Sequence, residues 1–277
     1  MNDNNRKLVL DYDGTLTNVI AHERPYASGF LHAFSQEVNI PLTRLESIVK
    51  LIKPIILADP MKGWEVNGFN VAPANSDPYM KTIAVFQEIG KNIEISDDER
   101  QAIFFRCHAS GYANCEMQLK PDAERFLESA TQARNRGRAF AKVYIITNSD
   151  PVSIQKKIDD MSVENIEVLG NAKKFIINPG WQEIPESVQH RGFLRPTLLR
   201  RELYSQALKK ISTNPTELIV VGDIWEMDLA LAEQLGIRTI KINNGCPIDY
   251  EDEYMKAKNA YANNLSETAE LLGLRLK

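Results

Sequence analysis

The sequence has few cysteines and no long apolar run. Its three cysteines, Cys107, Cys115 and Cys246, are odd in number and lack the C-x-x-C spacing. This usage favours a reducing cytoplasm over a disulfide framework. No apolar stretch approaches the ~20 residues that a membrane-spanning helix needs. The polar residues 1–7 lead straight into an apolar segment, so no signal peptide is expected.

The sequence also has few histidines and a small net charge. The four histidines show no spacing typical of zinc ligands: His22, His32, His108 and His190. With 33 Lys and Arg against 37 Asp and Glu, the net charge is −4, and no general attraction to nucleic acid or to an anionic membrane is expected. The sequence has no internal repeat or low-complexity tract. Its 277 residues suffice for one large or two modest domains with a sizeable core.

The most informative stretch is residues 8–17, Leu-Val-Leu-Asp-Tyr-Asp-Gly-Thr-Leu-Thr. An apolar run leads to Asp11 and Asp13, and Gly14 marks a turn, so both carboxylates are expected where a buried strand ends. Two carboxylates so close repel each other unless a cation lies between them or one is protonated. The pair is typical of a hard-metal site with a nucleophile and an acid/base group. An ordinary turn is the alternative, whereas a helix–loop–helix calcium site would need Glu in place of His22.

Strand and helix patterns alternate in the first strand and from about residue 120 onward. Strands are expected at 143–147, 166–169, 218–221 and 239–242, and helices at 122–136, 151–159, after Pro196, at 227–235 and at 266–272. This alternation predicts an α/β fold, a Rossmann-like doubly wound parallel sheet with helices on both faces. Such sheets place their chemistry at the carboxyl ends of the strands.

Residues 20–116 interrupt this alternation with a mainly helical pattern. Apolar side chains recur every four residues, and two capping boxes mark helix starts: Phe30, Phe34 and Val38, then Thr43 with Glu46 and Ser96 with Glu99. Residues 59–78 are expected to be loop, with at most a short strand near 66–71. The block is therefore predicted to be an insertion into the α/β domain.

Two further strand ends carry residues that suit a phosphoryl group and a cation. Thr147 ends the strand at 143–147 and Asn148 follows it, and a hydroxyl with backbone amides at a helix start suits phosphate. Asp223 follows another strand, and Asp228 stands five positions later. Each has an ordinary alternative, since Thr147 could cap a helix and Asp228 could be a surface residue. Their order along the predicted sheet nevertheless favours a single cleft.

Together these motifs resemble those of the haloacid dehalogenase (HAD) superfamily, most of whose members are magnesium-dependent phosphatases. Residues 11–15 match D-x-D-G-T, Thr147 matches the Ser or Thr of the second motif, and residues 222–228 match G-D-x-x-x-x-D. The resemblance covers the first strand and residues 120–272, while the helical block resembles the family's cap domain in position only.

The resemblance implies a division of the chain into two domains. Residues 1–19 and 117–277 would form the catalytic core, and residues 20–116 a helical cap that closes over the active site and selects the substrate. The cap sequence does not reveal that substrate. Conceivable contacts, each also typical of core or surface positions, are Trp64, Arg106, His108 and Lys120.

The third motif, a Lys or Arg before the helix that leads to the fourth motif, is the loosest match. Lys173 and Lys174 follow a strand, whereas Arg195 precedes Pro196 at the expected start of the long helix. Lys173 lies nearer the expected strand end and is preferred, while Arg195 has the better local context. Either could instead be a solvated surface cation.

By resemblance, the chain would hydrolyse a small-molecule phosphate monoester. Asp11 would attack phosphorus to give an aspartyl-phosphate, and Asp13 would act as general acid and then base. The Mg²⁺ site would comprise Asp11, the backbone carbonyl of Asp13, Asp223 and, at or near the ion, Asp228. The phosphoryl oxygens would be bound by Thr147, Asn148 and the cation at Lys173 or Arg195.

Asp13 favours phosphoryl transfer over carbon–halogen cleavage, because the family's dehalogenases lack an acid at this position. A phosphomutase or phosphotransferase that uses the same aspartyl-phosphate is an alternative. So is a non-catalytic binding protein that retained the fold. No nucleic-acid or membrane partner is expected, and the oligomeric state stays open.

Overall fold

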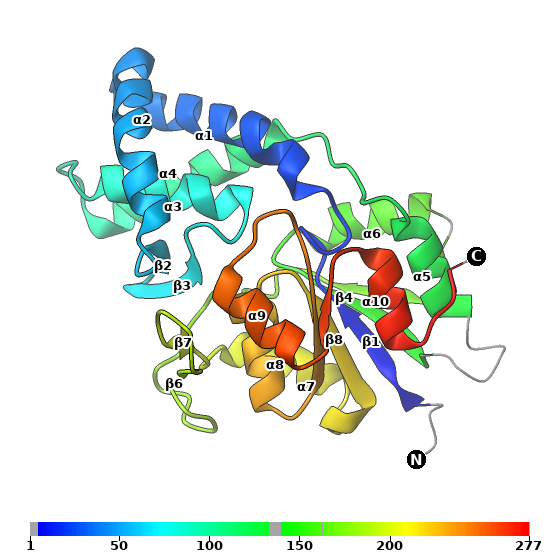
Figure 1. Ribbon diagram of the computed structural model, residues 1–277. Coiled ribbons are helices and arrows are strands. Elements are labelled where there is room, and N and C mark those ends of the chain that lie inside the picture. Colours follow the sequence, from blue (N-terminus) through cyan, green and yellow to red (C-terminus); the bar gives the residue numbers. More distant parts are fainter. Residues whose placement is uncertain (1–4, 133–139, 162, 277) are drawn as a thin grey trace. The chain divides into compact units, whose positions relative to one another are not determined.

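The computed structural model describes residues 5–132, 140–161 and 163–276, and the chain forms two compact units (Figure 1). Unit 1 comprises Met1–Asn18, Leu119–Asn244 and Ile248–Lys277, and unit 2 comprises Val19–Gln118 and Gly245–Pro247. Within the described ranges, every helix is too short or too polar to cross a membrane.

Unit 1 is built on a six-stranded sheet in the order β10-β9-β8-β1-β4-β5. All neighbouring strands are parallel, namely β1 (Lys7–Leu10), β4 (Lys142–Ile146), β5 (Ile166–Leu169), β8 (Leu218–Gly222), β9 (Arg238–Ile242) and β10 (Tyr261–Ala262). Leu10 pairs with both Ile145 and Val221, so β1, β4 and β8 end side by side. The predicted Rossmann-like parallel sheet is confirmed.

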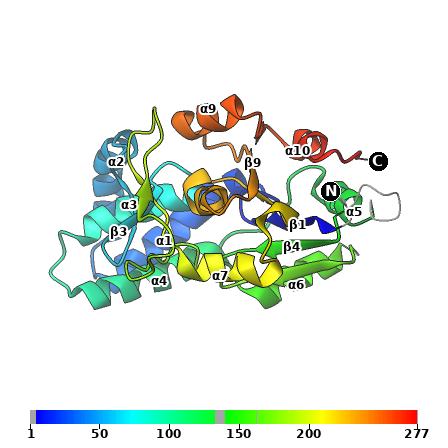
Figure 2. The same ribbon diagram turned by 90° about the horizontal axis from the view of Figure 1, so that it is seen from below.

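Helices cover both faces of this sheet. They are α5 (Ala123–Gln132), α6 (Pro151–Asp160), α7 (Glu202–Ile211), α8 (Ala230–Gln234), α9 (Asp249–Ala257) and α10 (Leu265–Leu272). In Figure 1, α7 and α8 lie on one side of the strands and α5 and α10 on the other, and the turned view in Figure 2 agrees. Every residue of β8 is buried, as expected for a parallel strand covered on both faces. The predicted helix end near residue 136 lies outside the described residues.

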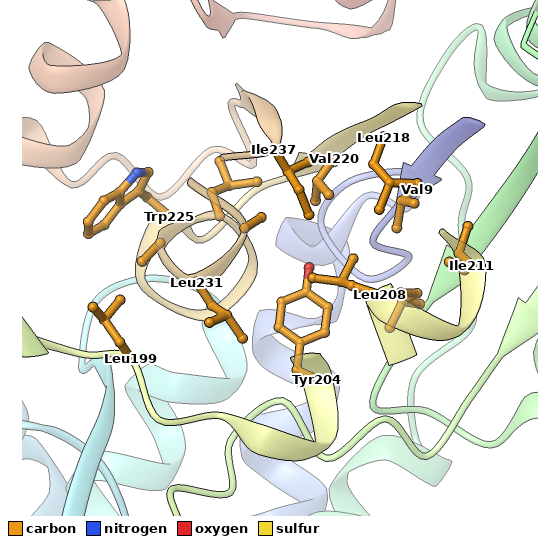
Figure 3. Close-up of a cluster of buried hydrophobic side chains, with 14 of the residues drawn as sticks. Val9, Leu199, Tyr204, Leu208, Ile211, Leu218, Val220, Trp225, Leu231 and Ile237 are labelled. Atoms are coloured by element: carbon orange, nitrogen blue, oxygen red, sulfur yellow. The ribbon is translucent and has the colours of Figure 1, made fainter. Parts of the chain in front are cut away.

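One face of the sheet packs against a large apolar cluster (Figure 3). Val9 and Val220 extend from the strands toward Tyr204 and Leu208 of α7. Trp225 is buried in the same cluster, farther from these side chains. This packing holds α7 and the segment after β8 against the sheet. Both elements therefore have fixed positions close to the carboxyl ends of the strands.

The route between β5 and α7 differs from the prediction. A short antiparallel hairpin of β6 (Ser187–Val188) and β7 (Thr197–Leu198) occupies it. Residues 197–198 form the second strand of this hairpin, so helix α7 starts only at Glu202. The prediction that this helix starts directly after Pro196 is wrong. Trp181 and Phe193 anchor the excursion in the apolar cluster.

The segment after β8 also differs from a regular helix. It begins as a π-helix, η5 (Trp225–Leu229), and continues as α8. The predicted helix at 227–235 is thus present, but its first turn is wider than an α-turn. Such π-turns are rare and are found frequently at functional sites.

Unit 2 is mainly helical, as expected for this block. A 3₁₀ turn, η2 (Val19–His22), precedes α1 (Glu23–Glu37), α2 (Leu42–Ala58), α3 (Pro78–Gly90) and α4 (Asp97–Ala113). Aromatic rings from α1, α3 and α4 pack together in its core, with centroid separations of 4.9–6.5 Å among Phe30, Phe34, Phe86 and Phe104. Ser96 caps α4 as predicted, through a bond from the Glu99 amide.

Two local predictions for unit 2 need correction. The segment 59–78, expected to be loop with at most a short strand near 66–71, contains a hairpin of two strands, β2 (Gly63–Val66) and β3 (Phe69–Pro73), because Asn67 and Gly68 both adopt the positive φ of a tight turn. Helix α2 begins after Pro41 without a side-chain cap from Thr43, and it continues through Pro54. That unit 2 acts as a cap remains a prediction.

Candidate active site

The carboxyl ends of four parallel strands carry the site residues. Asp11 follows β1, Thr147 follows β4, Asp223 follows β8 and Asn244 stands two residues after β9. Parallel strands that end at the same edge bring such residues together. The carboxylates of Asp11, Asp223 and Asp228 are all buried, and each offers an oxygen within 4.8 Å of the others. The structure therefore brings together three carboxylates of the first and fourth motifs, those of Asp11, Asp223 and Asp228.

Gly14 allows the first and fourth motifs to approach closely. It has a φ of 80°, and a Cβ at this position would overlap the carboxylate of Asp223. The Thr15 hydroxyl lies 3.5 Å from Asp11 Oδ2 and 3.4 Å from Asp223 Oδ1. The Thr17 hydroxyl accepts a hydrogen bond from the Gly14 amide at 3.0 Å, which holds the turn.

Lys174 is the cation that the structure places in the acidic cluster. Its Nζ lies 2.5 Å from Asp11 Oδ1 and 2.5 Å from Asp228 Oδ1, and its side chain is only 2% exposed. One ammonium group thus bridges the first and fourth motifs. The third motif was expected to supply such a cation, but the preferred residue was the neighbouring Lys173.

The structure does not place Lys173 or Arg195 with these carboxylates. Lys173 is exposed and adopts a left-handed φ of 48°, and the turn it makes leaves Lys174 as the buried neighbour. Arg195 is buried, but its guanidinium pairs with Glu226 at 2.7 Å. The preferred choice of Lys173 therefore gives way to Lys174, because backbone geometry at the turn decides which of two adjacent lysines reaches the site.

Side chains from two elements fix Lys174 and Asp228 in position. The Asn148 side-chain oxygen accepts a hydrogen bond from the Lys174 amide at 2.8 Å. Arg201 donates to the Lys174 carbonyl at 2.6 Å, and the Tyr204 hydroxyl donates to the Asp228 carbonyl at 2.8 Å. Asn148 was predicted as a phosphate-binding residue. Its side chain also holds the backbone of Lys174, a contact that the sequence did not indicate.

The second motif is linked to Asp13 through Ser149. The buried Thr147 hydroxyl accepts a hydrogen bond from the Ser149 amide at 3.1 Å, and the Ser149 hydroxyl donates to Asp13 Oδ2 at 2.8 Å. Asp150 caps α6, so the alternative in which Thr147 is the helix cap does not hold. Asp13 is partly exposed, and its carboxylate is not among the three clustered ones.

Asn244 is a site residue that sequence reasoning missed. Its side-chain amide donates to Asp223 Oδ2 at 2.7 Å, and the residue is buried. The strand at 239–242 was predicted, so the same strand-end reasoning that selected Thr147 could have selected Asn244. No such local signal exists for Arg201, which directly precedes α7, or for Tyr204, which lies in α7.

The electrostatics of the cluster favour a bound cation. Burial raises the pKa of Asp11 well above its ordinary value; Lys174 opposes this rise, while Asp228 and Asp223 add to it. Burial alone would lower the pKa of Lys174, but Asp11 and Asp228 hold that pKa above its ordinary value. Lys174 contacts two of the three buried carboxylates, so the cluster keeps excess negative charge. Oxygen donors of this kind fit Mg²⁺, which prefers them.

The comparisons with known proteins agree with this geometry. A family model described as haloacid dehalogenase-like hydrolase matches residues 7–236. No curated protein sequence gives a match.

Solved structures share the fold, among them the following three. A Bacillus subtilis protein assigned as the HAD-hydrolase YfnB, bound to magnesium, has a TM-score of 0.50 and 17% identity, with 97% of this chain and 99% of that chain covered. A Haemophilus somnus protein described as a phosphoglycolate phosphatase has a TM-score of 0.51 and 16% identity, covering 97% and 98%. A Bacteroides vulgatus protein described as a β-phosphoglucomutase has a TM-score of 0.53 and 15% identity, covering 97% and 88%.

Proposed function

The chain belongs to the haloacid dehalogenase-like hydrolase family, and from this premise we propose that it is a magnesium-dependent phosphatase acting on a small-molecule phosphate monoester. One observation carries the proposal. Lys174 Nζ contacts both Asp11 and Asp228 inside a buried cluster of carboxylates at the strand ends. Such a site combines a nucleophile with the positive charge that an anionic substrate requires.

Asp11 is the proposed nucleophile. Its carboxylate attacks phosphorus, the ester oxygen leaves, and an aspartyl-phosphate forms. An anionic nucleophile and an anionic phosphate repel each other, so the attack needs nearby positive charge. Lys174 supplies part of it, because its ammonium already lies 2.5 Å from Asp11 Oδ1.

Asp13 is the proposed acid/base. It gives a proton to the departing ester oxygen and then takes one from the water that attacks the aspartyl-phosphate. The Ser149 hydroxyl, 2.8 Å from Asp13 Oδ2, orients this carboxyl group. The second step returns Asp11 to its free carboxylate and Asp13 to its protonated state.

The remaining residues hold the phosphoryl group and the metal. Mg²⁺ would be held by Asp11, Asp223, Asp228 and the backbone carbonyl of Asp13, and it would neutralise charge on a phosphoryl oxygen. Thr147, the Asn148 amide and Lys174 would bind the phosphoryl oxygens. In this proposal Lys174 replaces the earlier candidates Lys173 and Arg195.

The solved structures support a small phosphorylated substrate, since proteins of this fold are described as a phosphoglycolate phosphatase and a β-phosphoglucomutase. A substrate-selecting role for residues 20–116 and a cytoplasmic location remain predictions. Hydrolysis is favoured over transfer because it needs only water as acceptor.

A panel of phosphate esters with Mg²⁺ tests the proposal. We expect release of inorganic phosphate that stops when EDTA removes the metal. Asp11→Asn should abolish turnover of an aryl phosphate while the circular dichroism spectrum stays that of the wild type. Asp150→Asn is the matched control, because Asn caps a helix as well as Asp and the residue lies outside the carboxylate cluster.

Two outcomes would contradict this function. Transfer of phosphate to a sugar without free phosphate would indicate a phosphotransferase. Absence of any magnesium-dependent activity across the panel would indicate a binding protein that kept the fold.

A further inference from the structure

Lys120 lies beside the loop that carries Asp11 and Asp13. Its neighbour Leu119 forms an antiparallel bridge with Thr17, and the Lys120 amide donates to the Leu16 carbonyl at 2.8 Å. The side chain of Lys120 reaches the end of β9, where Nζ donates to the Asn243 carbonyl at 2.8 Å. All these residues belong to unit 1.

The contacts of Lys120 place its ammonium on the Asp223 side of the acidic cluster. Asn243, which it contacts, directly precedes Asn244, and Asn244 holds Asp223 Oδ2 at 2.7 Å. Lys174 lies instead between Asp11 and Asp228. The cluster therefore has two lysines near it, held by different strand ends.

Lys120 is half-buried, and its partners differ from those of the two buried lysines of unit 1. Lys174 and Lys241 each contact carboxylates, at 2.5 Å and 2.6 Å. Among residues that the structure describes, the Asn243 carbonyl is the acceptor of Lys120 Nζ, and no carboxylate forms an ion pair with it. An ammonium group has three N–H donors, so this one keeps donors for a ligand.

The electrostatic environment of Lys120 also favours binding of an anion by its ammonium group. Burial lowers the pKa of Lys120 to about 8, although the charges of Asp223 and Asp11 act in the opposite direction. A desolvated cation with unused donors is stabilised by an anionic oxygen that it can contact directly. A phosphate monoester brings such oxygens to Asp11, and Lys174 is already shared between two carboxylates.

On the basis of the function proposed above, we propose that Lys120 is a second phosphate-binding cation, which donates hydrogen bonds to the substrate's phosphate group from the Asp223 side of the site. It would act together with Lys174, which approaches from the Asp228 side. Lys120 would then be a binding residue that touches the substrate.

The test measures binding of inorganic phosphate in the presence of Mg²⁺ by calorimetry, and binding of Mg²⁺ alone. Lys120→Met removes the charge, Lys120→Gln removes the charge but keeps a donor for the Asn243 carbonyl, and Lys120→Arg keeps the charge. Lys209→Met is the control, because Lys209 is an exposed lysine on α7 that pairs with Glu183.

We expect Lys120→Met and Lys120→Gln to weaken phosphate binding by about 10- to 100-fold, the range for a lost hydrogen bond to a charged group. Mg²⁺ affinity should stay unchanged in both. Lys120→Arg and Lys209→Met should bind phosphate within about threefold of the wild type, a difference below the cost of any charged hydrogen bond.

Several results would overturn this role of Lys120. Unchanged phosphate binding in Lys120→Gln would do so. So would parallel losses of phosphate and Mg²⁺ affinity, which would mean that Lys120 supports the Asn243–Asn244 segment instead. If the wild type binds phosphate but hydrolyses no ester, the proposed function fails while the variants still decide the role of Lys120. A wild type that binds no phosphate would overturn both.

Discussion

At Lys174, one ammonium group offsets two buried carboxylates, and the neighbouring Lys173 contributes nothing comparable. Lys173 is exposed and adopts a left-handed φ of 48°, whereas Lys174 is buried. A buried charge whose partner is removed is strongly unfavourable, whereas an exposed lysine can be replaced at little cost. The two adjacent residues therefore form a natural experimental pair.

Lys174→Met should reduce kcat by at least about 100-fold and lower the free energy of unfolding by about 3 kcal/mol, since Asp11 and Asp228 lose their shared partner. Lys173→Met should change each quantity little. Steady-state kinetics and urea denaturation of both variants measure these effects. Equal losses in the two variants would contradict the assignment of Lys174.

Asn244 contacts Asp223, one of the proposed metal ligands. Asn244→Ala removes the amide that holds Asp223 Oδ2, and groups that orient a metal ligand typically affect affinity by about 10- to 100-fold. We therefore expect Mg²⁺ binding, measured by calorimetry, to weaken by at least about 10-fold. Asn214→Ala, at an exposed 3₁₀ turn, is the control and should leave Mg²⁺ affinity unchanged.

At the scale of elements, α7 and the π-turn η5 act as one support. Tyr204 of α7 is 1% exposed, and its hydroxyl bonds the Asp228 carbonyl, while Trp225 of η5 packs in the same apolar cluster. The buried pair of Arg195 and Glu226 ties the β6–β7 excursion to this turn. Arg195, expected as a site cation, thus contributes to the site through the element that carries Asp228.

Tyr204→Phe should lower the free energy of unfolding by about 1–2 kcal/mol, because a buried carbonyl loses its hydrogen bond. It should also reduce kcat by a smaller factor than Lys174→Met does. Tyr144→Phe, on β4, is the control. A Tyr204→Phe protein with wild-type stability and activity would show that α7 does not support Asp228 in this way.

In unit 2, α1 and α4 are joined by a hydrogen bond between the Tyr26 hydroxyl and His108 Nδ1 at 2.7 Å. Burial lowers the pKa of His108 from 6.5 to about 4. Between these values the unfolded chain binds more protons at His108 than the folded chain does. The contribution of His108 to stability is therefore present above pH 6.5 and decreases as the pH falls toward 4.

His108→Gln should remove this part of the pH dependence. The free energy of unfolding of the wild type should decrease more than that of the variant between pH 7 and pH 5, with His32→Gln, an exposed histidine, as the control. Denaturant titrations at both pH values measure the difference. Identical pH dependence in the wild type and His108→Gln would disprove the effect.

At the scale of the whole molecule, the site residues all belong to unit 1, whereas unit 2 has its own aromatic core. A ligand that binds the folded state stabilises it by mass action, by about 2.7 kcal/mol at a concentration of 100 times Kd. Mg²⁺ should therefore stabilise the part of the chain that contains the carboxylate cluster. The expected effect is local, because the proposed ligands all belong to unit 1.

Amide hydrogen exchange can measure this local stabilisation by Mg²⁺. We expect Mg²⁺ to slow amide exchange in the segments after β1 and β8 and to leave the helices of unit 2 unaffected, and EDTA should reverse the change. Asp223→Asn should abolish the protection. Equal protection in both units would contradict a site confined to unit 1.

The sequence by itself determined the sheet and the meeting of its strand ends. The apolar runs before Asp11, Thr147 and Asp223 are local signals, and parallel pairing brings their ends to one edge. Gly14, required by the close approach of Asp223, could also be recognised from the motif. Local periodicity and turn chemistry suffice for these features because they depend on neighbouring residues.

Only the tertiary structure decided which polar side chains complete the site. Three contacts each join residues more than 20 positions apart: Lys174 with Asp11, Arg195 with Glu226, and Asn244 with Asp223. The left-handed turn at Lys173 also bears on which of the two adjacent lysines is buried. Such contacts follow from how the elements pack, since a buried charge or donor takes the partner that packing brings within reach. A strand-end position could mark Asn244 as a candidate, but no pattern along the chain encodes which partner its side chain takes.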